Sequence, residues 1–284
     1  MMEALLTLQK FKEIRNRAFK RVVESFSDEI ATHTVQLWLV VDDDGDKAIP
    51  YATAVLLEAN GFRYLLTAAH VLDGIDVKNL AFWDDQELVQ VSGRAVYLSN
   101  RAEINRMGDV AVWLLSDDAR DALSKHYVFL PFDRVGRDHQ LKTEERYFLM
   151  GYPVSKTKKI FKTMTIPIMS LKFFTRGELS DCKMKRNQLD PKVNFMLEYH
   201  RRKAQTVGAS YRQVEHLPAP HGMSGCGLWY LDDDKIGRLV GIMIGYNHVD
   251  TIMIASRIDL ATEMIRKSFD ASVAQSHTIT VNWV

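Results

Sequence analysis

Short β-forming runs joined by tight turns are the feature that most constrains the fold of this chain. Residues 51–57 and 62–67 combine aromatic, aliphatic and β-branched side chains, and Asn60-Gly61 lies between them. This dipeptide favours the positive φ angles of a two-residue hairpin turn. Further β-forming runs in the first half cover residues 34–40, 80–83, 88–91 and 95–98. The pattern predicts an antiparallel all-β unit with about enough strands to close a barrel.

The length of the chain allows a second unit of the same kind. It has 284 residues, of which 46% are hydrophobic, enough to bury one large core or two small ones. Residues 116–145 are charged and carry few strand signals, so we place the domain boundary there. The expected domains are a helical extension (1–33), a first β-barrel (34–130), a second β-barrel (131–258), and a C-terminal helix with a tail (259–284).

Both ends of the chain carry further secondary-structure signals. Apolar residues recur every three or four positions in 3–32 and again in 258–269, which predicts amphipathic helices. We expect the first helix to pack against the barrels of its own chain. The alternative is a contact with a partner protein or with a second copy of the chain. Residues 239–246 and 251–256 are β-forming runs that predict a closing hairpin over residues 247–250. Residues 277–284 alternate between polar and apolar types, which predicts one more strand.

A glycine-rich stretch late in the chain carries the clearest candidate chemistry. In the sequence HGMSGCGLW, from His221 to Trp229, Ser224 has Gly225 directly after it and Gly222 two positions before it. Glycines permit positive φ angles and expose a serine hydroxyl together with nearby N–H groups, as an acyl-transfer nucleophile requires. The alternative from these residues alone is a glycine-rich hairpin without chemistry.

Two upstream residues supply the partners that such a serine needs. His70 ends the run YLLTAA, whose alanines leave space for an imidazole that acts as a general base. A lone histidine at this place would more often be a core residue. Asp109 precedes the run VAVWLL, where it is either a turn former or the buried carboxylate that orients a histidine.

Taken together, His70, Asp109 and Ser224 resemble the catalytic residues of the chymotrypsin-like (trypsin-fold) serine peptidases. The matching motifs are Thr67-Ala68-Ala69-His70, Asp109-Val110-Ala111-Val112, Gly222-Met223-Ser224-Gly225-Cys226-Gly227 and, at the start of the second half, Phe148-Leu149-Met150-Gly151-Tyr152-Pro153. If these residues form the triad, their chain order excludes subtilisin-like enzymes and hydrolases with a nucleophile elbow. The resemblance extends over about residues 35–260.

The resemblance implies a fold of two six-stranded antiparallel β-barrels and the activity of a serine endopeptidase that acts on a restricted set of protein substrates. The triad would be His70, Asp109 and Ser224, and the backbone N–H groups of Gly222 and Ser224 would form the oxyanion hole. The primary substrate pocket would be lined by Met243, Ile244 and Tyr246, which favours an apolar or small side chain. The alternative is a catalytically inactive trypsin-fold protein that acts as a protein-binding module.

One position departs from the secreted members of that family. Met223 stands where relatives activated by cleavage have an aspartate that pairs with the new N-terminus. A thioether cannot form that ion pair. The sequence therefore argues against activation by trimming of the N-terminus.

Charge and cysteine content limit the expected partners. The net charge of +1 gives no argument for nucleic acid or an anionic membrane. We expect the basic clusters 183–186 and 200–203 to lie in solvated loops and strand edges. The acidic turn from Asp42 to Asp46 lacks the bidentate glutamate of an EF-hand, so we expect a solvated turn. No metal or cofactor is expected, and the predicted partner is a protein or peptide substrate.

The expected location is the bacterial cytoplasm. Cys182 and Cys226 are the only two cysteines, so the multiple disulfides of secreted trypsins cannot form. The first residues lack the pattern of a signal peptide, and no apolar run is long enough to cross a bilayer.

Overall fold

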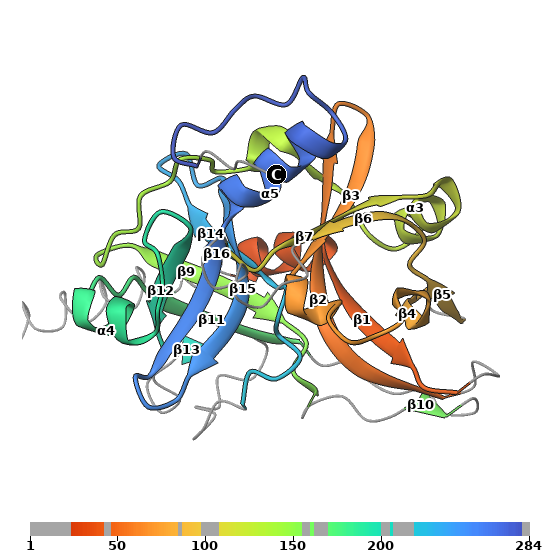
Figure 1. Ribbon diagram of the computed structural model, residues 1–284, viewed down its shortest axis with the longest axis horizontal. Helices are drawn as coiled ribbons and strands as arrows, with labels where there is room; N and C mark the ends of the chain where they lie inside the picture. The colour runs from red at the N-terminus through yellow and green to blue at the C-terminus, as the bar shows by residue number, and fades with distance from the viewer. Residues whose placement is uncertain are drawn as a thin grey trace, which may run out of the picture.

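The computed structural model describes residues 24–42, 47–84, 87–97, 108–154, 160–161, 170–199, 205–206 and 219–279. Its strands form two curled, mostly antiparallel sheets that lie side by side, with few helices (Figure 1). Among the described residues the first sheet contains nine strands and the second contains seven. The all-β class with two barrel-like halves, predicted from the sequence, is confirmed.

The first sheet has the strand order β5-β4-β1-β2-β3-β7-β6. Its strands are β1 (Thr34–Val40), β2 (Lys47–Ala59), β3 (Phe62–Thr67), β4 (Leu80–Trp83), β5 (Leu88–Gln90), β6 (Gly93–Tyr97) and β7 (Ala111–Leu115), and the two-residue strands β8 (Leu130–Pro131) and β10 (Ile160–Phe161) pair with β2. Asn60 and Gly61 have φ angles of 51° and 81°. The predicted β2–β3 hairpin is therefore confirmed.

The second sheet has the order β12-β16-β15-β14-β9-β11-β13. Its strands are β9 (Arg146–Gly151), β11 (Leu171–Arg176), β12 (Asn194–Glu198), β13 (Gln205–Thr206), β14 (Gly227–Leu231), β15 (Gly237–Asn247) and β16 (Ile252–Arg257). The predicted hairpin near the end of the chain corresponds to β15 and β16, which pair in antiparallel register.

Among the described residues, three large hydrophobic cores hold the two sheets, and a small fourth cluster surrounds Trp38 and Ala48. One core packs inside the first curled sheet around Leu56 and Phe82, and a second packs inside the other sheet around Phe173 and Leu228. The third core lies between the sheets and includes the fully buried Trp229. Helix α5 (Ile258–Ser268) contributes to this third core and lies above the junction of the sheets in Figure 1. Full burial of a large apolar side chain here stabilises the fold by about 1.5–3 kcal/mol relative to leaving it exposed.

The described part of the N-terminal helix packs against its own chain. This part covers residues 24–32, and its Phe26 and Ile30 are buried in the core between the sheets. Glu29 also forms an ion pair with Arg134, with 2.6 Å between Oε1 and Nη2. Residues 1–23 lie outside the described residues, so a partner contact through them stays a prediction.

Two helices occur where the sequence pattern did not indicate them. Helix α3 (Asp117–Ser124) forms in the charged connection because Ser116 caps it and its apolar face is buried in the first core. The basic cluster 183–186 lies on α4 (Asp181–Arg186), capped by Ser180, so its assignment to loops and strand edges was wrong. The second basic cluster, 200–203, lies outside the described residues. In the acidic turn only Asp42 is described, and its Oδ1 accepts a hydrogen bond from the N–H of Lys47 (2.9 Å).

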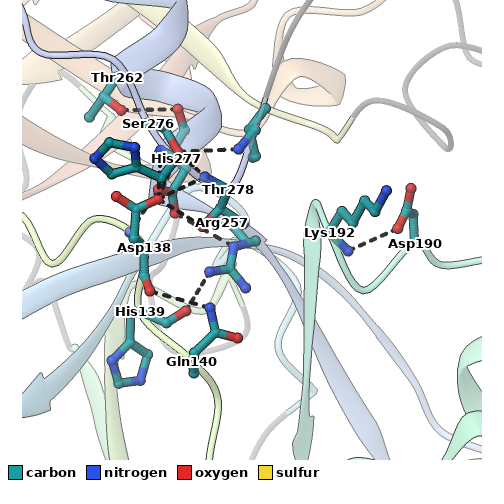
Figure 2. A network of polar contacts seen from close by, with 12 residues as sticks. Asp138, His139, Gln140, Asp190, Lys192, Arg257, Thr262, Ser276, His277 and Thr278 are labelled. Atoms are coloured by element: carbon teal, nitrogen blue, oxygen red, sulfur yellow. Dashed lines mark hydrogen bonds and ion pairs between the residues drawn. The ribbon is translucent and has the colours of Figure 1, made fainter.

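The segment after α5 is held by a side chain and not by strand pairing. Residues 277–279 are not in a strand, and residues 280–284 lie outside the described part. The carboxylate of Asp138 accepts hydrogen bonds from the backbone N–H groups of His277 (2.9 Å) and Thr278 (2.8 Å) and from the hydroxyl of Ser276 (3.0 Å), as Figure 2 shows. These bonds use the backbone donors that a strand ladder would need, so the predicted strand does not form at this point.

Candidate active site

The chain places His70 directly after a strand of the first sheet. Strand β3 ends at Thr67, and a single 3-10 turn, η1 (Ala69–Val71), follows. The alanines at 68 and 69 are fully buried, whereas the side chain of His70 is 38% exposed. The small buried residues thus fix the backbone while the ring stays accessible.

Asp109 lies just before β7 and holds this histidine at two atoms. Its Oδ1 accepts a hydrogen bond from the backbone N–H of His70 (2.9 Å), and its Oδ2 lies 2.5 Å from His70 Nδ1. The carboxylate is only 8% exposed. The backbone N–H of Asp109 donates to the hydroxyl of Ser256 (3.0 Å), which comes from β16 of the other sheet. Bonds to both oxygens fix the carboxylate and, through it, the imidazole plane.

Ser224 completes the cluster from the second sheet. It lies in the segment His221–Cys226, which we call the serine loop, just before β14. The Oγ of Ser224 is 3.0 Å from Nε2 of His70. The structure therefore brings together the three residues that the sequence analysis selected, from three segments of the chain.

The residue after the serine has to be a glycine. Gly225 has a φ of +90°, and a Cβ at this position would lie 2.0 Å from the carbonyl oxygen of Thr53 and 2.1 Å from Oγ1 of Thr67. Both of these atoms belong to the first sheet. The glycine lets the serine loop lie directly against β2 and β3, which brings Ser224 within reach of His70.

Two backbone N–H groups of the serine loop, those of Gly222 and Ser224, point away from the groups that bind the carbonyl oxygens of the same two peptides. The carbonyl oxygen of His221 accepts from the N–H of Val154 (2.8 Å), and that of Met223 accepts from the N–H of Cys226 (2.9 Å). In a trans peptide the following N–H points in the opposite direction, so these bonds orient the amides of Gly222 and Ser224. Within the part of the chain that the structure describes, neither amide donates a hydrogen bond.

The three residues predicted to line a substrate pocket lie in or beside β15 but differ in exposure. Met243 is buried in the core of the second sheet, and its backbone bonds the serine loop through Gly225 (N–H to Met243 O, 2.7 Å). Ile244 is half-buried and packs against the first core. Tyr246 is half-buried, with its ring centroid 5.7 Å from that of His221 in an edge-to-face arrangement. Of these three residues, only Ile244 and Tyr246 therefore have accessible side chains.

Two side chains of the serine loop are buried beneath it. Met223 and Cys226 are fully buried in the core of the second sheet. Burial raises the pKa of the Cys226 thiol far above its ordinary value. The thiol is therefore protonated at neutral pH and unsuited to act as a nucleophile.

Sequence reasoning missed several residues that hold the site. Ser256 binds the backbone of Asp109, Val154 orients the His221 peptide, and Thr53 contacts the serine loop. A buried serine in the largely apolar strand 252–257 is a weak signal for such a role. Nothing in the local pattern of 51–57 sets Thr53 apart from its neighbours, because its hydroxyl partner in the serine loop lies 169 positions away.

Within the described residues, no group of three or more His, Cys, Asp or Glu side chains is arranged to hold a metal ion. The described helices include none with the length and apolar character needed to cross a membrane.

The two curled antiparallel sheets, with terminal helices and a His-Asp-Ser cluster between them, have the fold of the chymotrypsin-like serine proteases. Among solved structures, the VesB protease of Vibrio cholerae matches with a TM-score of 0.51 and 14% identity, over 83% of this chain and 63% of that chain. A thermostable serine protease, AL20, from an extremophilic microorganism matches with a TM-score of 0.47 and 12% identity, over 85% of this chain and 97% of that one.

The present chain thus spans 63% of the length of the VesB chain. At 14% identity the likeness shows the two-barrel fold alone. No protein-family model and no curated protein matches the sequence.

Proposed function

We propose that this chain is a serine endopeptidase that hydrolyses peptide bonds through an acyl-enzyme. One observation carries the proposal: both ring nitrogens of His70 are engaged, Nδ1 by the Asp109 carboxylate at 2.5 Å and Nε2 by the Ser224 hydroxyl at 3.0 Å. A base that is oriented on one side and bonded to a nucleophile on the other is the arrangement required for covalent acyl transfer.

In the first step Ser224 Oγ attacks the carbonyl carbon of the scissile bond while His70 Nε2 takes the hydroxyl proton. The carbonyl π electrons move onto oxygen and give a tetrahedral oxyanion. The C–N bond then breaks, His70 gives its proton to the departing amine, and an ester to Ser224 remains. Asp109 stabilises the imidazolium that exists between the two proton transfers.

The second step repeats this chemistry with water. His70 removes a proton from the water as its oxygen attacks the ester carbon, and then returns the proton to Ser224 Oγ as the acid leaves. His70 thus acts as base and acid in turn, which its fixed position between Asp109 and Ser224 supports.

The backbone N–H groups of Gly222 and Ser224 would bind the oxyanion in both steps. They donate to no described protein group, and the carbonyl oxygens of their peptides are held on the opposite side. Donors that are oriented before the reaction stabilise developing charge without reorganisation, and the loss of one typically costs about 3 kcal/mol.

The proposed substrates are proteins or peptides, in a restricted set. Ile244 and Tyr246 are the accessible side chains among the pocket residues suggested by the sequence, which favours an apolar or small residue before the scissile bond. We further propose the domain division 1–33, 34–130, 131–258 and 259–284. The bacterial source and the cytoplasmic location stay predictions from the sequence.

Peptide cleavage tests the proposed function directly. The purified protein is incubated with a complex mixture of peptides, and new termini are read by mass spectrometry, with Ser224→Ala as the matched control. Cleavage by the wild type at a limited set of sites, absent in Ser224→Ala, is the expected result. If neither protein cleaves any peptide and both bind the same peptides, the chain is the protein-binding module that the sequence analysis left as the alternative.

A further inference from the structure

Thr53, in the middle of β2, makes four hydrogen bonds around the serine loop with its backbone N–H, its carbonyl oxygen and its hydroxyl. Its N–H donates to the carbonyl oxygen of Ser224 (2.9 Å), and its own carbonyl oxygen accepts from the Thr67 hydroxyl (2.9 Å). Its hydroxyl donates to the carbonyl oxygen of Gly222 (2.8 Å) and accepts from the N–H of Tyr152 (3.0 Å). The residue is fully buried.

The strand geometry explains why the backbone of Thr53 faces the serine loop. Backbone groups of alternate residues in a strand point to opposite neighbours. Leu56 donates its N–H towards the β1 side, to His33 O, so Val55 and Thr53 face the β3 side. Residue pairing with β3 ends at Val55 and Leu66, because the chain then turns towards His70. The serine loop lies along the edge of β2 beside Thr53, where β3 no longer pairs.

The hydroxyl of Thr53 holds the one peptide that separates the two candidate oxyanion donors. The N–H of Gly222 precedes this peptide and the N–H of Ser224 follows it, while its carbonyl oxygen is the acceptor of the Thr53 bond. The same hydroxyl binds Tyr152 N–H, two residues before Val154, which orients the His221 peptide. One buried hydroxyl therefore joins both segments that set the directions of the donors.

We propose that Thr53 is a positioning residue of the oxyanion hole, and this rests on the proposed function of Ser224 as the nucleophile. The Thr53 hydroxyl keeps the Gly222–Met223 peptide in the orientation in which the two flanking N–H groups converge on the substrate oxygen. It touches neither substrate nor the reacting atoms. Without the hydroxyl, the Gly222 carbonyl and the Tyr152 N–H both lose this partner, and among the described residues the peptide is held only by the bond from Met223 N–H to Pro220 O (3.0 Å).

The substitution Thr53→Val tests the hydroxyl, since valine keeps the shape of threonine and its backbone bonds. The measurement is the rate constant for phosphonylation of Ser224 by a small alkyl fluorophosphonate, whose P=O oxygen binds in the same hole. We expect Thr53→Val to react about 10-fold to 100-fold more slowly than the wild type. This reduction in rate is no larger than that caused by removing one oxyanion-hole donor. Thr53→Ser, which keeps the hydroxyl, should react within about threefold of the wild type.

A second buried threonine in the same sheet provides the matched control. The hydroxyl of Thr34 donates to Ile30 O (2.8 Å), and the residue is as fully buried as Thr53. Thr34→Val therefore removes a comparable hydroxyl bond away from the serine loop, and it should react at about the wild-type rate. In Thr53→Val the low-field proton resonance of the His70–Asp109 hydrogen bond and the shape of the pH–rate profile should stay as in the wild type, because only the hole is altered.

Three results would overturn the proposal: a wild-type rate in Thr53→Val, an equal slowing in Thr53→Ser, or an equal slowing in Thr34→Val. If Thr53→Val does not fold, Thr53→Ser decides alone, since a 10-fold slower reaction with the hydroxyl retained contradicts the role by itself. Failure of the proposed function looks different, because the wild type itself would then not react.

Discussion

The Nε2 atom of His70 lies 3.0 Å from Oγ of Ser224, although 154 positions separate the two residues in the chain. The histidine follows a strand of the first sheet, and the serine precedes a strand of the second. The pair therefore exists only when the two halves are packed against each other. The shared core that includes Trp229 and α5 is what holds that arrangement.

The three clustered side chains should act as a unit. Ser224→Ala, His70→Ala and Asp109→Asn are each expected to lower kcat by about 10⁴-fold or more. The double variant Ser224→Ala/His70→Ala should be no slower than the slower single variant, because either change removes the same proton-coupled attack. Steady-state hydrolysis of a cleaved peptide measures this, with thermal unfolding as the check on folding. Multiplicative losses in the double variant would mean that the two residues act independently.

Gly225→Ala should damage the fold and the site together. Its φ of +90° is costly for alanine, and the added Cβ meets the Thr53 carbonyl oxygen at 2.0 Å. We expect a loss of at least about 2 kcal/mol in the free energy of unfolding, with loss of activity. Gly245→Ala is the matched control in β15, since a Cβ there meets nothing within 4 Å. Equal stabilities of the two variants in chemical denaturation would contradict the close approach of the serine loop to β2.

His139 should make stability fall in acid. Its side chain is only 9% exposed, and burial lowers its pKa to about 4, opposed by Glu145 and aided by Arg257 and Lys142. The unfolded chain binds a proton below the ordinary pKa of about 6.5, whereas the folded chain does not until about pH 4. Stability present above pH 6.5 is therefore lost as the pH falls towards 4, by up to about 3 kcal/mol.

The variant His139→Phe isolates that contribution. It keeps a ring beside Tyr230, whose centroid lies 4.4 Å from that of His139, and removes the titrating group. The difference in unfolding free energy between pH 7 and pH 4, measured with denaturant, should be smaller in the variant than in the wild type. The same pH dependence in both proteins would show that His139 is not buried in its neutral form.

The two cysteines should differ in reactivity. Cys182 is exposed on α4, whereas Cys226 is buried at the end of the serine loop, and burial raises the pKa of its thiol. Iodoacetamide should modify the folded protein once, at Cys182, and modify both residues after denaturation, as read by mass spectrometry. Cys226→Ala should keep most of the activity, and mild peroxide should leave the wild type active. Cys226 would instead be a redox switch if peroxide abolished the activity of the wild type, a thiol reductant restored it, and Cys226→Ala were insensitive to peroxide.

Local patterns were sufficient to predict most of the fold. The Asn60-Gly61 turn, the β15–β16 hairpin and the amphipathic period of α5 each depend on neighbours in the sequence. Of the strand expected at 277–284, the described residues 277–279 form none, because the side chain of Asp138, distant in sequence, accepts hydrogen bonds from two of their backbone N–H groups. Helix α3 was missed because its stability comes from packing on the first core.

The candidate site was predictable to the same extent. The residues proposed to carry the chemistry stand out by type and context, as His70 after its alanines and Ser224 among its glycines do. Residues that hold the site through hydrogen bonds to distant segments do not. Thr53 and Ser256 could be recognised only once the structure had brought their partners from the other sheet.

Covalent labelling of Ser224 tests the central claim most directly. The wild type, Ser224→Ala and His70→Ala are each incubated with a fluorophosphonate probe, digested, and analysed by mass spectrometry for the modified residue. The account predicts one adduct per wild-type chain, located on Ser224, with no adduct in Ser224→Ala and strongly slowed labelling in His70→Ala. A folded wild type that remains unlabelled, or that is labelled at another residue, would contradict it.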